Sequence, residues 1–184
     1  MILAVHSDAS YLSEAKARSR AGGHFYMTNK NDEEFNNGAV LTVSTIIKHV
    51  MASASEAELA AMFYNSREAL PLRVTLEEMG HPQLATPITV DNSTAHGLTE
   101  GSMIPKRSKA MDMRFHWLSC REAQKQFNFI WRKGSINRAD YHTKHHPPSP
   151  HRLKRSEYLA QNASSLPPIL QGIQRVVSIL LTLP

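Results

Sequence analysis

The chain has 184 residues, of which 41% are hydrophobic and 20% are charged, proportions that are typical of a folded globular domain and not of a disordered chain. Its single cysteine, Cys120, excludes an intramolecular disulfide and suits a reducing compartment. The apolar start, residues 1–5, is too short for a signal peptide, and no window offers the ~18 apolar residues that a membrane span requires. We therefore expect a soluble protein inside the cell, with no membrane partner.

The net charge of +5 is distributed unevenly along the chain. Residues 1–100 carry 7 Lys or Arg against 12 Asp or Glu, whereas residues 101–138 carry 9 against 2. An acidic first half and a basic second half suit an anionic substrate, with carboxylates that bind metal ions and cations that bind phosphates. A solvated helix face explains the basic stretch equally well.

Three strands are predicted at the start of the chain. Residues 2–11, 22–27 and 39–47 are apolar or rich in β-branched side chains, and turn-forming clusters separate the last two of these runs. Short turns between consecutive strands favour antiparallel pairing. We therefore expect a three-stranded meander.

A long helix is predicted next. Ser55 and Glu58 have the spacing of a capping box at its N-terminus, and Gly80 is typical of a helix end. Apolar residues recur between them at helical spacing. Pro71 interrupts the pattern, and we expect a kink or a break there because proline lacks a backbone N–H.

The second half of the chain alternates between strands and helices. Residues 87–91 and 127–131 predict two further strands, and residues 106–124 and 137–143 predict a basic helix and the start of a last helix. A strand reached through a helical crossover is expected to be parallel to an earlier one. The pattern predicts an α/β fold in which helices cover a mixed sheet.

The composition changes after residue 146. Residues 147–151 are rich in proline and are predicted to be extended and not helical. The sequence then becomes basic and, from residue 166, apolar. We expect one domain over residues 1–146 and a poorly ordered tail over residues 147–184.

Four acidic residues fall where predicted elements meet: Asp8, Glu58, Asp91 and Asp140. Carboxylates in this arrangement suit two-metal hydrolysis of a phosphodiester, because hard divalent cations take oxygen ligands. Three of them also have ordinary structural interpretations. Glu58 completes the predicted capping box, Asp140 suits a helix N-terminus, and Asp91 suits a turn. Asp8 is the hardest to explain structurally, because an acid directly after an apolar run is poor strand chemistry.

Five short motifs accompany these acids in a fixed order: SDASY at 7–11, SEAEL at 55–59, VDNSTA at 90–95, RSKAMDMRFH at 107–116 and ADYHTK at 139–144. Together they resemble the ribonuclease H domain of copia-type LTR retrotransposon polyproteins, over residues 1–146. The resemblance implies an RNase H-like α/β fold, with a five-stranded mixed sheet in the order 3-2-1-4-5 flanked by helices.

The resemblance also implies an activity, metal-dependent endonucleolytic cleavage of the RNA strand of an RNA–DNA hybrid. Asp8, Glu58, Asp91 and Asp140 would be the catalytic residues and the ligands of two Mg²⁺ or Mn²⁺ ions. Glu56 competes with Glu58 for the helix position, and we favour Glu58 because the family motif places its acid before a Leu-Ala-Ala stretch.

The implied partners are the hybrid and the reverse transcriptase portion of the polyprotein. Such a hybrid is recognised by its backbone shape and 2′-hydroxyls. We expect the protein in cytoplasmic virus-like particles, with the nucleus as a second location. The residues expected to contact nucleic acid are Ser10, Asn92, Ser93, Lys106, Arg107, Lys109 and Arg114. For each cation among them, a solvated helix face stays an alternative.

Two further functions stay open. The first is an inactive relic that keeps the fold and binds nucleic acid without cutting it, which Pro71 favours. Cellular ribonucleases H also carry a histidine just before the last aspartate, and residues 133–138 have none; His142 is the candidate substitute. The second is an integrase-like nuclease, which we disfavour because its glutamate would lie on a later helix.

A zinc site is the remaining alternative for the histidine-rich segment. His142, His145, His146 and His151 lie close together in the sequence. Their spacing fits no standard zinc finger, and only one cysteine is present to supply sulfur. We therefore expect no zinc.

Overall fold

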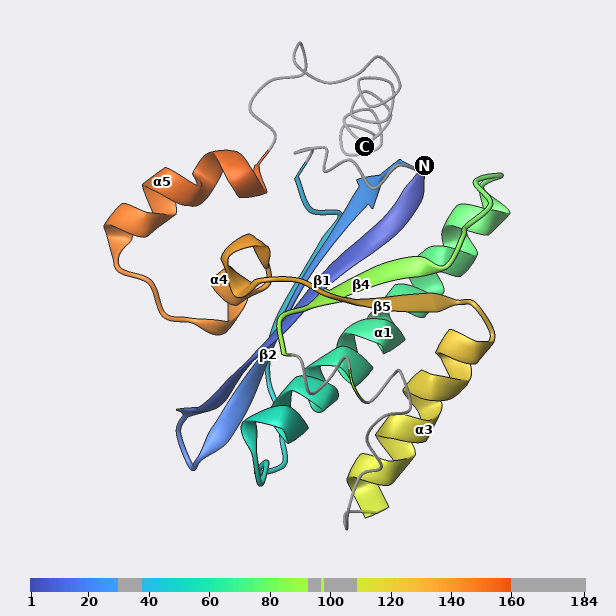
Figure 1. Ribbon diagram of the computed structural model, residues 1–184. Coiled ribbons are helices and arrows are strands. Elements are labelled where there is room, and N and C mark those ends of the chain that lie inside the picture. The colour runs from blue at the N-terminus through green and yellow to red at the C-terminus, as the bar shows by residue number, and fades with distance from the viewer. Residues whose placement is uncertain (30–37, 93–96, 98–108, 160–184) are drawn as a thin grey trace, which may run out of the picture.

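The computed structural model describes residues 1–29, 38–92, 97 and 109–159. Their centre is a five-stranded sheet made of β1 (Ile2–Glu14), β2 (Arg18–Thr28), β3 (Leu41–Ile46), β4 (Thr86–Val90) and β5 (Phe127–Trp131). The strand order is β3-β2-β1-β4-β5 (Figure 1). β1, β2 and β3 pair antiparallel, whereas β4 is parallel to both β1 and β5. The predicted mixed sheet and its strand order are confirmed.

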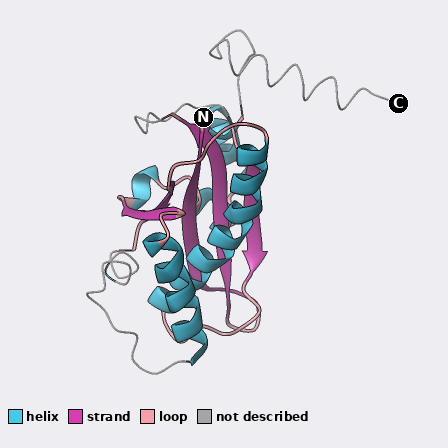
Figure 2. Cartoon of the chain, turned by 90° about the vertical axis from the view of Figure 1, so that its right-hand side faces the viewer, coloured by secondary structure: helices cyan, strands magenta, loops and turns pink. Residues whose placement is uncertain are grey.

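Helices cover both faces of this sheet. They are α1 (Ala54–Glu78), α3 (Lys109–Ala123), α4 (Asp140–Thr143) and α5 (Pro148–Tyr158). A Cβ atom added to Gly22 would meet α4 at Thr143, and one added to Gly23 would meet α1 at Asn65. Consecutive strand residues point to opposite faces, so α1 and α4 lie on opposite sides of β2. Figure 2 shows the helices of one face in front of the strands.

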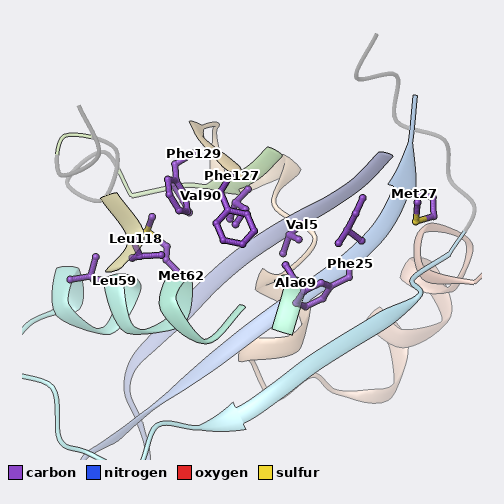
Figure 3. Close-up of a cluster of buried hydrophobic side chains, with 12 residues drawn as sticks. Val5, Phe25, Met27, Leu59, Met62, Ala69, Val90, Leu118, Phe127 and Phe129 are labelled. Atoms are coloured by element: carbon purple, nitrogen blue, oxygen red, sulfur yellow. The ribbon is translucent and has the colours of Figure 1, made fainter. Parts of the chain in front are cut away.

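The main core lies between the sheet and the face formed by α1 and α3. Phe25, Ile88 and Phe127 from the strands and Leu59, Met62 and Leu118 from the two helices are almost completely buried. Figure 3 shows several of these side chains gathered over the strands. Burial of apolar surface of this kind supplies most of the driving force for folding, and it fixes α1 over β1.

The N-terminus of α1 lies two residues before the predicted position. Ser53 is the N-cap, and its Oγ accepts a hydrogen bond from the Glu56 backbone N–H at 3.1 Å. The Glu56 carboxylate in turn accepts from the backbone N–H of Ala52 at 2.7 Å. The predicted capping box of Ser55 and Glu58 is therefore wrong, because Ser53 and Glu56 satisfy the same S-x-x-E spacing. The structural interpretation of Glu58 is lost with it.

Proline does not break α1. The helix runs without interruption through Pro71, which lies on its exposed side, where water can hydrate the Arg67 carbonyl that loses its partner. Gly80 ends the helix as predicted, with φ of +84°. The backbone N–H of His81 donates to the Leu76 carbonyl, and that of Gly80 donates to the Glu77 carbonyl, as in a Schellman motif.

The segment after residue 146 differs from the prediction. Residues 147–151 are not extended throughout, because α5 begins at Pro148. Proline is tolerated in the first helical turn, where a backbone N–H has no partner within the helix. The Tyr158 hydroxyl donates to the Arg138 carbonyl at 2.8 Å and ties α5 to the rest of the chain. The predicted division at residue 146 stays a prediction.

The remaining boundaries follow the sequence closely. β5 has its predicted limits, β4 begins one residue early, and the predicted last helix is reduced to the four residues of α4 after a short 3₁₀ turn, Gly134–Ile136. Residues 106–108 of the predicted basic helix lie outside the described residues. Among the helices of the described part of the chain, none has the length and apolarity needed to cross a membrane.

Candidate metal centre

Parallel pairing of two central strands brings Asp8 and Asp91 together. Val5 pairs with Ile88 and His6 with Thr89, and the same register continued by two residues places Asp8 beside Asp91. Asp91 directly follows the end of β4. The carboxyl end of β4 and the middle of β1 therefore form one side of the site.

α1 adds a third carboxylate from above the sheet. Asp8, Glu58 and Asp91 each offer a carboxylate oxygen, and these three atoms lie within 4.8 Å of one another. Asp8 and Glu58 are 5% and 7% exposed, and Asp91 is half-buried. Within the described parts of the chain, this is the one group of three or more potential ligands close enough to hold an ion. We call it the acidic trio.

Asp140 lies beside the acidic trio but not within it. It is the first residue of α4 and forms an ion pair with Lys144, one turn further along the chain. Its negative charge raises the pKa of each member of the acidic trio. The Thr143 hydroxyl, on the same short helix, donates a hydrogen bond of 2.5 Å to Asp8. The structure thus brings three predicted ligands together and places the fourth close enough for its charge to raise their pKa values.

Burial and mutual repulsion oppose ionisation of the trio. Burial, together with the charges of Asp91 and Asp140, raises the pKa of Asp8 to about 7, although the Thr143 hydrogen bond opposes the change. Burial and the charge of Asp8 raise the pKa of Glu58 to about 9. The pKa of Asp91 is also raised, mainly by burial. A bound cation would remove this unfavourable charge, because opposite charge nearby favours the ionised carboxylate.

The donor set fits a hard divalent cation. All three ligand candidates are carboxylates, the oxygen donors that Mg²⁺ and Mn²⁺ prefer. One oxygen of Glu58, Oε2, is buried and has no hydrogen-bond partner among the described residues. Buried polar atoms are normally satisfied, and an unpaired one calls for an explanation such as an ion. A metal ion at the acidic trio supplies that explanation.

No family model matches the chain. Over 117 residues it is 29% identical to the Retrovirus-related Pol polyprotein from transposon TNT 1-94 of Nicotiana tabacum. The chain is a homologue of a retrotransposon Pol polyprotein. The match covers 64% of the chain, whereas the chain spans only 8% of the length of the polyprotein. The predicted resemblance to this class of polyprotein is confirmed.

Solved structures share the fold. LC11-RNase H1, isolated from compost, aligns with a TM-score of 0.55 over 77% of this chain and 91% of its own, at 13% identity. The same enzyme in complex with an RNA/DNA hybrid gives 0.55 over 76% and 91%, at 12% identity. RNase H1 from Halobacterium salinarum gives 0.53 over 77% and 93%, at 14% identity. The fold of this Pol homologue is therefore that of ribonuclease H, as predicted.

Two residues that the sequence did not single out surround Asp91. The indole Nε1–H of Trp131, at the end of β5, donates to the Asp91 carbonyl at 2.9 Å. A Cβ atom added to Gly134 would lie 2.7 Å from Asp91 Oδ2. Any residue other than glycine at this position would therefore displace the carboxylate. Both lie at least 40 residues from Asp91 in the chain, and no local pattern reports such contacts.

The residues predicted to contact nucleic acid divide into three groups. Ser10 and Asn92 lie within two residues of Asp8 and Asp91, respectively, and are half-buried. Arg114 lies on α3 with its guanidinium 6.0 Å from the centre of the Phe63 ring. Ser93, Lys106 and Arg107 lie outside the described residues, as does the side chain of Lys109. The predicted contacts with nucleic acid stay predictions.

The ring of His142 is partly enclosed by other side chains. Its ring stacks on buried His24, with centroids 5.8 Å apart and planes inclined by 14°. Its Nε2 is buried and has no hydrogen-bond partner among the described residues. A histidine that assists product release needs access to solvent and to the substrate. The side chain of His142 is half-buried, and its interpretation as a substitute for the missing loop histidine stays a prediction.

Proposed function

We propose that the chain is the ribonuclease H domain of a retrotransposon Pol polyprotein, which cleaves the RNA strand of RNA–DNA hybrids endonucleolytically. The observation that carries the proposal is the acidic trio, at the carboxyl end of β4 on a ribonuclease H fold, with Asp140 beside it. Similarity to a Pol polyprotein and the fold shared with an RNase H1 solved with an RNA/DNA hybrid support it.

The proposed catalytic residues are Asp8, Glu58, Asp91 and Asp140, holding two Mg²⁺ or Mn²⁺ ions. When bound, such a pair of ions activates a water molecule and stabilises the leaving oxygen of the phosphodiester. Thr143 holds the Asp8 carboxylate through its hydroxyl hydrogen bond. The burial of Asp8 and Glu58 excludes bulk water and so strengthens their interaction with a cation.

The substrate would lie across the open side of the trio. Ser10 and Asn92 would contact its backbone, and the basic segment around Lys106, Arg107, Lys109 and Arg114 would bind phosphates. The reverse transcriptase portion of a Pol polyprotein would deliver the hybrid as it is synthesised, in a cytoplasmic virus-like particle or in the nucleus.

The test is cleavage of a hybrid with a label on its RNA strand, in the presence of Mg²⁺. Wild type should cut the RNA, and Asp91→Asn and Glu58→Gln should each lose at least about a hundredfold in rate, because each removes a proposed ligand. Glu68→Gln is the matched control, since Glu68 lies on α1 as well but is exposed. It should cut at the wild-type rate.

A folded wild-type chain that binds the hybrid but leaves the RNA intact would contradict the proposal and establish the binding relic instead. Pro71 no longer favours that alternative, because α1 is continuous through it.

A further inference from the structure

A buried asparagine on α1 lies two helical turns after Glu58. Asn65 is completely buried, and its Nδ2 donates to Ser7 Oγ and to the Gly22 carbonyl, each at 2.8 Å. Residues seven apart share one face of a helix, so Asn65 and Glu58 both face the sheet. A Cβ atom added to Gly23 would lie 2.3 Å from Asn65 Oδ1, which shows how closely this amide approaches the strands.

A second buried asparagine precedes α4. Asn137 is 5% exposed, and its Nδ2 donates to the Ser7 carbonyl at 2.9 Å. Its Oδ1 accepts from the backbone N–H of Ala139 at 3.1 Å, one residue before Asp140. The backbone N–H of Arg138, which lies between Asn137 and Ala139, donates to His6 Nδ1 at 2.9 Å. The chain that leads into α4 is thus tied to β1 by side-chain hydrogen bonds.

Both amides therefore bind the same residue of β1, Ser7, which directly precedes Asp8. One amide comes from the helix that carries Glu58, and the other comes from the segment that leads into α4 and Asp140. Each hydrogen bond joins segments far apart in the chain, by 58 and 130 residues respectively. A shift of either element along β1 would leave a buried amide unpaired, which is unfavourable.

We propose that Asn65 and Asn137 are positioning residues for the metal centre. Asn65 sets the position of α1 along β1 and so holds Glu58 beside Asp8. Asn137 fixes the segment before α4 on β1 and so holds Asp140 beside the acidic trio. The inference rests on the proposed metal-binding role of these acids. Partners that orient metal ligands commonly contribute ten- to a hundredfold to metal affinity.

Double-mutant cycles with Mg²⁺ binding as the readout separate positioning from a general structural role. The single variants are Asn65→Ser, Asn137→Ser, Glu58→Gln and Asp140→Asn, and Mg²⁺ affinity is measured by titration calorimetry on the full chain. Each asparagine variant should weaken Mg²⁺ binding about tenfold. In the double variants Asn65→Ser/Glu58→Gln and Asn137→Ser/Asp140→Asn, the asparagine change should add nothing further. In the crossed pairs most of the asparagine effect should remain, because each asparagine and the acid changed with it lie on different elements.

Thr86→Val is the matched control for loss of a buried hydrogen bond. Thr86 Oγ1 accepts from Arg73 Nη1 at 2.6 Å, at the opposite end of β4 from Asp91. This variant should lower the unfolding temperature and leave Mg²⁺ affinity within about twofold of wild type. Thermal unfolding establishes first that each variant is folded. If a serine variant is not, Asn65→Leu or Asn137→Leu, which preserves the side-chain volume without the amide, takes its place.

Two results would overturn the positioning role. Asparagine variants that bind Mg²⁺ like Thr86→Val would make these residues structural only, and so would equal losses in the cognate and crossed pairs. A wild-type chain that binds Mg²⁺ but cuts no hybrid would overturn the proposed function alone, because the cycles still report positioning. A wild-type chain that binds no Mg²⁺ would overturn both.

Discussion

The carboxylates of the acidic trio are unfavourable when ionised, unless a proton or a bound cation neutralises their charge. Asp8, Glu58 and Asp91 are three acids brought within 4.8 Å, and burial is the largest cause of the raised pKa of each. A structural ion pair would show the opposite arrangement, with a cation beside each carboxylate. The residues are therefore placed at the expense of stability, as is common at functional sites.

Glu58 gives the clearest pH prediction. Its folded-state pKa of about 9 lies above the ordinary value of 4.5, so the folded state holds its proton more tightly than the unfolded state does. The stability that this proton provides is complete below about pH 4.5 and is lost as the pH rises towards 9. In chelator, the Glu58→Gln variant should therefore be more stable than wild type at pH 8, by about 4 kcal/mol, because pH 8 lies well above the unfolded pKa of 4.5 and each pH unit is worth about 1.4 kcal/mol.

Denaturant unfolding at pH 5 and pH 8 measures this difference. Mg²⁺ should make wild type the more stable protein at pH 8, because the ion stabilises the ionised site of wild type and not the amide of Glu58→Gln. Equal stabilities of the two proteins at both pH values would show that Glu58 is not held protonated.

Gly134 lies directly against the carboxylate of Asp91. An alanine Cβ would lie 2.7 Å from Asp91 Oδ2, so Gly134→Ala should displace the carboxylate. We expect about tenfold weaker Mg²⁺ binding, in line with the effect of disturbing the groups around a ligand. Ser135→Ala, at the exposed neighbouring position, is the control. Unchanged Mg²⁺ affinity in Gly134→Ala would show that Asp91 does not bind the ion.

The site residues differ in how far the sequence could predict them. Asp8, Glu58 and Asp91 stand out because each lies in a motif beside a predicted element, and the family resemblance joins them. Trp131 and the two asparagines lie in none of these motifs, and Thr143 lies in one but has no predicted role. Their partners lie 40 to 135 residues away in the chain, and such contacts depend on strand register and helix placement.

At the scale of elements, the strands and the end of α1 followed from local chemistry. Both errors at helix starts have a physical reason. Ser53 and Ser55 offer the same hydroxyl within two residues, and only the fold selects between them. Prolines exclude a helix interior but not a first turn, so the prolines at 148 and 150 permitted α5. The continuity of α1 at Pro71 depended on which side of the helix faces solvent.

The packing of α4 on the sheet gives a prediction for acid stability. His24 is completely buried beneath the His142 ring, and its ring nitrogens have no hydrogen-bond partner among the described residues. Burial, with the nearby charges of His142 and Arg138, lowers the pKa of His24 to about 3. The unfolded chain therefore takes up the proton first, and stability should fall as the pH drops from about 6.5 towards 3.

His24→Phe should remove part of this loss, because phenylalanine fills a similar space and cannot be protonated. Buried His6, with its pKa also lowered to about 3, should account for part of the remainder. The measurement is the difference in unfolding free energy between pH 7 and pH 5, which we expect to be about 2 kcal/mol smaller in the variant. An equal difference in both proteins would show that His24 is already protonated or accessible in the folded state.

At the scale of the whole molecule, the fold makes the site. Parallel β1 and β4 place two acids side by side, α1 brings a third over one face, and the chain that crosses to the other face delivers Asp140. These segments meet at one point because β1 lies between β2 and β4 in the strand order β3-β2-β1-β4-β5. Similarity in fold at 12–14% identity shows that this fold tolerates wide change in sequence.

Cleavage specificity distinguishes a ribonuclease H from other nucleases and from a protein that only binds nucleic acid. Wild-type protein and Asp91→Asn would be incubated with Mg²⁺ and with three labelled substrates: an RNA–DNA hybrid, the same RNA alone, and the corresponding DNA duplex. We predict cleavage of the RNA strand of the hybrid only, abolished by chelator and by Asp91→Asn. Cleavage by wild type and Asp91→Asn alike, or none by folded wild type, would contradict it.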